Sequence, residues 1–149
     1  MKHRVQVAAA AAIAERVSGI FSPLPGSDPA PLQRALALAW QYAEGSGIPP
    51  ARIIEAREQL SAVIPDVERN PGKQAAMSAG VTALYALSAI SDASPQSAAR
   101  AFGAALDAVV SHAEDPDAAE EAEVAFQEST LEIAKSIGAK PVTRSAFMK

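Results

Sequence analysis

The chain has 149 residues, a formal net charge of −4 and no cysteine. The lack of cysteine excludes disulfide frameworks, thiol nucleophiles, iron–sulfur clusters and cysteine-based zinc sites. The acidic balance disfavours a general nucleic-acid-binding protein, because such proteins are usually basic. A chain of this length corresponds to about one domain.

Alanine dominates the composition, with 35 residues, whereas aromatic residues make up only 5%. Alanine has the highest helix propensity, and its small side chain lets helices pack closely. We therefore predict an all-α fold, a single-domain bundle of about six antiparallel helices with an alanine-rich core. This domain is expected to span residues 1–138, and residues 139–149, which lack periodicity, are expected to form a flexible C-terminal tail.

The N-terminus resembles a signal peptide, because three basic residues precede the apolar run Val5–Ala14. The run consists mainly of alanine, so its hydrophobicity is weak. We favour an N-terminal helix from Arg4 to Ile20 with Glu15 and Arg16 facing solvent, and a cytoplasmic protein. A weak export signal in Val5–Ala14 is the open alternative.

A capping residue followed by proline marks the predicted N-terminus of four later helices. Asp, Asn and Ser accept hydrogen bonds from free N–H groups of the first turn, and proline there loses no hydrogen bond. The pairs are Asp28-Pro29, Asn70-Pro71, Ser94-Pro95 and Asp115-Pro116. With a less sharp start at Pro49-Pro50, the predicted helices are Pro29–Glu44, Pro49–Ile64, Pro71–Ser91, Pro95–Glu114 and Pro116–Ile137.

Helical periodicity also predicts which side of each helix faces the core. The uncharged stretch Gln74–Ser91 is too polar for a membrane span and is expected to be a central helix instead. The inward residues expected for the second and third helices are Leu32, Leu36, Ala39, Trp40, Ala43, Ile53, Ala56, Leu60 and Val63. In Gln74–Ser91 the apolar residues fall on two sides, with Met77, Val81, Leu84 and Tyr85 on one and Leu87 and Ile90 on another. The fifth helix is built on Ala98, Phe102, Ala105, Leu106, Val109 and Val110, and the sixth carries Ala122, Ala125, Phe126, Ser129, Ile133 and Ile137 along one face.

Several short apolar signatures occur in a recognisable order. They are Leu32–Trp40, Leu60–Asp66, Ala83–Ala89, Ala98–Val110 and a final acidic helix with Glu120, Glu121 and Glu123. This order resembles the YjaG-like family of bacterial all-α proteins, a domain of unknown function, over roughly Val5–Ile137. The chain is shorter, richer in alanine and poorer in aromatics than that family. The resemblance implies a helical fold and no catalytic residue.

The sequence contains few residues that could form a catalytic or metal-binding site. Its only histidines are His3 and His112, and no serine lies in a nucleophile-elbow motif. His112 and Glu114 are two residues apart and would point about 200° apart on a helix, which is unsuitable for a shared metal. We expect no catalytic residue, no metal and no cofactor, with Asp115 capping the next helix.

Acidic residues are concentrated near the C-terminus, in contrast to the rest of the chain. Residues 1–60, 61–113 and 114–149 carry net charges of +1, −1 and −4. A surface of one sign attracts a partner of the other sign and speeds its capture. Eight acids and no base lie between Glu114 and Ala134, and the candidate partner-binding residues are Glu114, Asp115, Asp117, Glu121, Glu128 and Glu132.

Three interpretations follow from this pattern. The first is a non-catalytic module that binds a basic protein, in its concrete form a bacterial immunity protein that neutralises a cationic toxin such as a nuclease. The second is a homodimeric structural or regulatory module that buries an alanine-rich helix face. The third, and weakest, is an enzyme that uses carboxylates alone or with a metal. Nucleic acid and membrane are not expected partners, and an acidic face with no partner also remains open.

Overall fold

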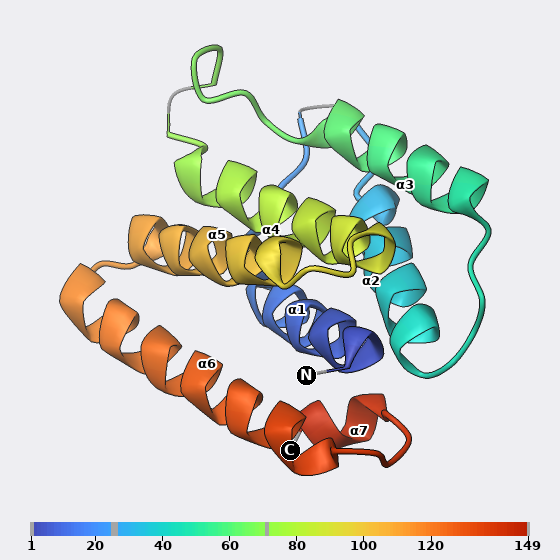
Figure 1. The fold of residues 1–149 in the computed structure, drawn as a ribbon. Coiled ribbons are helices and arrows are strands. Elements are labelled where there is room, and N and C mark those ends of the chain that lie inside the picture. The colour runs from blue at the N-terminus through green and yellow to red at the C-terminus, as the bar shows by residue number, and fades with distance from the viewer. Residues whose placement is uncertain (1, 25–26, 71, 149) are drawn as a thin grey trace.

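The computed structural model describes residues 2–24, 27–70 and 72–148. These residues form seven α-helices and one 3₁₀ turn, and no strand occurs among them (Figure 1). The all-α prediction is confirmed. The elements are α1 (His3–Val17), η1 (Ser18–Ile20), α2 (Ala30–Ala43), α3 (Pro50–Val63), α4 (Gln74–Ser91), α5 (Gln96–His112), α6 (Pro116–Ile137) and α7 (Arg144–Phe147).

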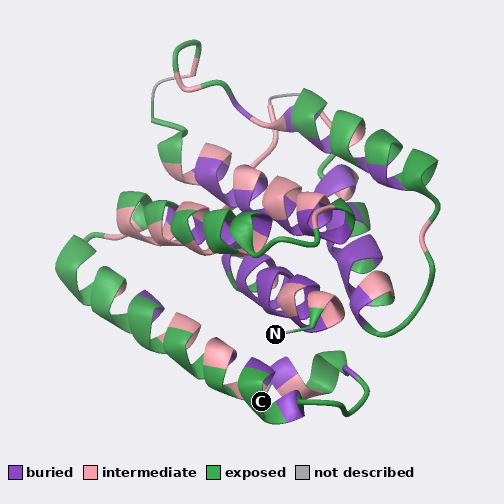
Figure 2. Ribbon diagram, viewed as in Figure 1, coloured by how far each residue is buried: buried purple, intermediate pink, exposed green. Residues whose placement is uncertain are grey.

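Helix α1 is the centre of the molecule. It contacts α2, α4, α5, α6 and α7, and every residue from Val7 to Ala14 is buried (Figure 2). The apolar run that resembles a signal peptide is thus the innermost helix of the fold. Its alanines leave room for neighbours on all sides, as close helix packing requires.

Helices α4 and α5 lie side by side and run in opposite directions (Figure 1). Alanines occupy the buried centre of both helices, for example Ala83 and Ala105. Larger side chains such as Leu84 and Phe102 are only half-buried beside them. Small residues therefore lie where the helices approach most closely, and large ones fill the flanks.

The predicted inward stripes of the second and third helices are confirmed, because all nine residues are buried. In α4, Leu87 and Ile90 are buried as predicted. The remaining predicted residues of α4 and α5, except Ala105, are half-buried. The residues so displaced to the flanks are Met77, Val81, Leu84, Tyr85, Ala98, Phe102, Leu106, Val109 and Val110.

One of the four predicted caps is wrong and a second is weak. Helix α4 begins at Gln74 rather than at residue 71, because Asn70 instead uses its amide to bond the Asp66 carbonyl; Pro71 lies outside the described residues. Before α5, Ser94 accepts a hydrogen bond from the Gln96 amide as predicted, but at 3.4 Å, and Asp92 accepts shorter ones from Ser94 and Ser97. The Ser94 hydrogen bonds hold the pKa of Asp92 below its usual value.

The other two caps are confirmed in position. Asp115 accepts a hydrogen bond from the Ala118 amide at 3.1 Å and begins α6. Asp28 accepts one from the Ala30 amide at 2.8 Å at the start of α2. Both satisfy a first-turn N–H group that has no partner within the helix.

The C-terminal segment is more ordered than the sequence suggested. Residues 144–147 form α7, and Phe147 is buried against Trp40, with ring centroids 5.9 Å apart. Arg144 donates hydrogen bonds to Glu15, which raise the pKa of the Arg144 guanidinium. The prediction of a flexible tail over 139–149 is thus wrong for residues 144–147. Their contacts are with residues about a hundred positions earlier in the chain, and periodicity cannot reveal contacts of that range.

Glu15 departs from expectation, whereas Arg16 does not. Glu15 is half-buried and accepts a hydrogen bond from the Trp40 indole N–H at 3.0 Å. Arg16 is exposed, as predicted, although its Nε pairs with a carboxylate of α6. These two side chains join α1 to α2, α7 and α6.

Two helical glycines give a matched test of packing. A methyl group on Gly80 would lie 2.7 Å from Ile64 Cγ1 and 3.0 Å from Phe21 Cε1, whereas one on Gly103 meets nothing within 4 Å. Gly103→Ala is expected to stabilise the fold by about 0.5–1 kcal/mol through helix propensity. Gly80→Ala should destabilise it by about 1 kcal/mol, because overpacking outweighs that gain. Urea unfolding of both variants checks the opposite signs, and equal stabilisation would contradict them.

None of the helices in the described ranges combines the length and apolar character that crossing a membrane would need. The expectation that Gln74–Ser91 is a protein-enclosed helix agrees with this, since ten of its residues are buried by neighbouring helices.

Candidate functional site

Helix α6 turns one acidic side to solvent. Asp117, Glu121, Glu128 and Glu132 are all exposed, and their spacings of four, seven and four residues place them within about 60° of the helix circumference. We call these four residues the acidic ridge. The opposite side of α6, which carries Thr130, Ala134 and Ile137, is buried.

The ridge carboxylates are largely unpaired within the described chain. The one ion pair found there joins Glu132 to Lys135 at 3.5 Å, and both of these side chains are about two-thirds or more exposed. An exposed pair of this kind contributes little energy and is screened by salt. The ridge therefore keeps most of its negative charge available to a partner.

The other predicted binding residues lie at the start of the ridge. Glu114 and Asp115 are exposed and precede the first turn of α6, where Asp115 serves as the cap. Glu120, about 100° around the helix from Glu121, lies to one side of the ridge. The structure thus brings the six predicted residues onto one helix and its entry, although Asp115 already has a structural role.

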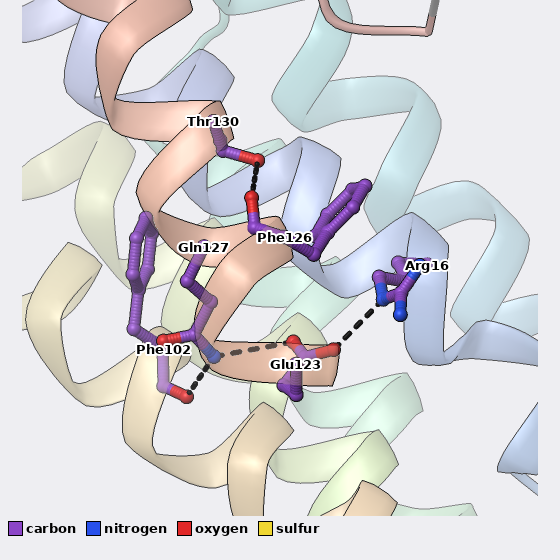
Figure 3. A network of polar contacts seen from close by, with 6 residues as sticks. All are labelled: Arg16, Phe102, Glu123, Phe126, Gln127 and Thr130. Carbon is purple, nitrogen blue, oxygen red and sulfur yellow. Dashed lines mark hydrogen bonds and ion pairs between the residues drawn. The ribbon is translucent and has the colours of Figure 1, made fainter. Parts of the chain in front are cut away.

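Glu123 does not belong to this surface. Its side chain is fully buried, and Arg16 Nε donates to its Oε2 at 2.7 Å (Figure 3). Gln127 Nε2 donates to its Oε1 at 3.2 Å and to the Phe102 carbonyl at 2.9 Å. The Arg16 guanidinium also stacks on the Phe126 ring at 4.1 Å. We call these residues the Glu123 network; it ties α6 to α1 and α5.

The inward face predicted for α6 was therefore wrong in part. Ala122, Ala125 and Ser129 are exposed, and Phe126 and Ile133 are half-buried; only Ile137 is buried as predicted. A charged residue occupies the buried position because its partner is on α1, 107 residues earlier in the chain. Periodicity in α6 cannot detect a pairing of that range.

An apolar flank adjoins the ridge. Val124 is 39% exposed and lies on the helix between Glu121 and Glu128. Leu131, seven residues further on, is on nearly the same side of α6 and lines a groove of about 320 Å³. Neither residue belongs to a motif or stripe that is evident in the sequence. The groove is lined by Gln6, Ala9, Pro95, Ala98, Ala99, Phe102 and Leu131.

The described residues include no group of three or more His, Asp or Glu side chains that could hold a metal ion. His112 is exposed at the end of α5, and the nearby Asp115 is engaged in capping. His3 makes contacts elsewhere, with Nε2 bonded to the Ala89 carbonyl and Nδ1 2.9 Å from the Tyr42 hydroxyl. His3 thus lies apart from the acidic ridge.

Comparison of the chain with protein-family models, with curated proteins and with solved structures finds no match. The resemblance to the YjaG-like family therefore stays a prediction.

Proposed function

We propose that this protein is a non-catalytic binding module that presents the acidic ridge of α6 to a basic protein partner. The observation that carries the proposal is the alignment of four exposed carboxylates, Asp117, Glu121, Glu128 and Glu132, along one side of a 22-residue helix. First-turn acids complement the helix dipole, which accounts for Asp117. That effect does not account for Glu128 and Glu132, which lie far from the N-terminus.

The concrete form of this proposal is a bacterial immunity protein in the cytoplasm that neutralises a cationic toxin, for example a nuclease. Such a protein needs a stable scaffold and a negative surface that competes for the toxin's basic substrate-binding face. The α6 ridge on an alanine-packed helical core supports this role. Electrostatic attraction would speed capture of the toxin.

Reversing the charge of Glu121, Glu128 and Glu132 to lysine should abolish this recognition while the fold stays intact, because all three side chains are exposed. The probe is an octalysine peptide, followed by ¹⁵N NMR at low salt. We expect amide shifts to concentrate on residues 117–132 in the wild type, and binding at least about tenfold weaker in the variant.

The matched control reverses three exposed acids elsewhere, Glu58, Glu68 and Asp107, and so changes net charge by the same amount. If both triple variants lose octalysine binding equally, net charge alone governs the interaction and the ridge proposal fails. The immunity form is tested with any toxin-like protein encoded immediately upstream, whose association rate should fall in the ridge variant and with rising ionic strength.

A further inference from the structure

We infer that the partner element recognised by this protein is a basic amphipathic helix, which packs its apolar side against the Val124–Leu131 flank and the groove beside it. This inference deepens the proposed function and rests on it. It names the kind of structure that carries the partner's positive charge.

Helix α6 carries two apolar residues at a spacing that suits a partner helix. Val124 and Leu131 are seven residues apart, which is about 10.5 Å or two helical turns on one side of the helix. A partner helix with apolar side chains at positions i and i+7 would meet both of them. Helices that dock in grooves are recognised by anchors at this kind of spacing.

The groove beside Leu131 offers room for apolar side chains of a partner. Its volume of about 320 Å³ is bordered by α1, α5 and α6, and its lining includes Ala98, Ala99 and Phe102 from α5. Leu131 joins the groove to the exposed flank of α6. A cleft of this size accepts one or two aliphatic side chains rather than a flat contact.

The carboxylates beside the apolar flank favour a basic partner helix. On the helix wheel, Glu128 lies about 40° from Val124 and 60° from Leu131, and Glu132 follows next on the ridge. A helix seated on Val124 and Leu131 therefore has carboxylates along one edge. Lysine or arginine beside its apolar stripe would meet them, whereas an acidic helix would be repelled. A purely apolar partner would leave those carboxylates without a counter-charge.

The probe is a fluorescein-labelled 18-residue peptide made of leucine and lysine. Its leucines stand at positions i, i+3, i+4 and i+7, in a pattern that repeats every seven residues, so that they form one side of a helix. Two control peptides replace every leucine by serine or every lysine by glutamate. Fluorescence anisotropy measures binding to the full chain. We expect micromolar affinity for the leucine–lysine peptide and at least tenfold weaker binding of both controls.

Protein variants separate the two halves of the surface. Ala99→Phe fills the groove from an exposed position on α5, and Ala122→Phe adds the same ring on an exposed part of α6 outside it. Glu128→Gln with Glu132→Gln removes charge without changing shape. We expect at least tenfold weaker peptide binding for Ala99→Phe and for the double glutamine variant, and less than twofold change for Ala122→Phe.

The possible results distinguish the helix-in-groove inference from the ridge proposal. Equal binding by wild type and Ala99→Phe, with sensitivity to the glutamine substitutions, overturns the helix-in-groove inference and leaves the ridge proposal intact. If Ala99→Phe loses peptide binding but neither the double glutamine variant nor added salt weakens it, the role of the ridge is overturned, and the inference with it. Failure of the leucine–lysine peptide to bind wild type overturns the inference, while octalysine separately tests the ridge.

Discussion

Replacing Arg16 with alanine is expected to destabilise the fold by about 3 kcal/mol, because it strands the Glu123 carboxylate in a fully buried position. The value lies at the lower end for buried pairs, since Arg16 is 37% exposed and part of its charge is already screened. For a chain of this length, such a loss lowers the melting temperature by about 10 °C. Thermal and urea unfolding measure it.

Two comparisons sharpen that experiment. Lys135→Ala breaks the exposed pair with Glu132 and should cost less than about 0.5 kcal/mol. Adding Glu123→Gln to the Arg16→Ala variant should recover part of the loss, because a neutral amide is less costly to bury than an unpaired carboxylate. An Arg16→Ala effect no larger than that of Lys135→Ala would show that the Glu123 network does not hold α6 in place.

Replacing Ala11 with leucine in α1 is expected to destabilise the fold by about 3 kcal/mol. Ala11 has no exposed surface, and its helix is covered by five others, so the added carbons can be accommodated only by moving helices apart. Overpacking of a dense core usually costs 1–3 kcal/mol, and enclosure on every side places this site at the upper end. Urea unfolding gives the difference directly.

The control is Ala122→Leu, which makes the same substitution at an exposed position of α6. It should change stability by less than about 0.5 kcal/mol, because surface substitutions away from special features are nearly neutral. If Ala11→Leu were as mild as this control, α1 would have free space around it and could not be the tightly enclosed centre of the fold.

The sequence predicts local features of this protein well. Asp115-Pro116 marks the first turn of α6 because capping is decided by adjacent residues. The apolar stripes of α2 and α3, including Trp40 and Leu60, follow from periodicity alone. The four carboxylates of the ridge share a face because they share one regular helix.

What the sequence does not predict depends on partners distant along the chain. Glu123 reads as one more surface acid until Arg16 is placed beside it. The segment around Phe147 has no periodicity, and its burial depends on the position of Trp40. The groove beside Leu131 likewise combines residues of three helices. Each of these features requires tertiary packing, which overrides local preference.

The position of α1 has a consequence for biosynthesis. The ribosome makes α1 before the helices that cover it, and α5 and α6 begin 79 or more residues after α1 ends. A nascent chain thus holds an alanine–valine helix that α2 and α4 cover only in part, and the native enclosure is complete only when α6 has emerged. Ribosome-stalled chains that end before residue 116 should accordingly remain sensitive to protease within α1, whereas released full-length chains should resist cleavage there.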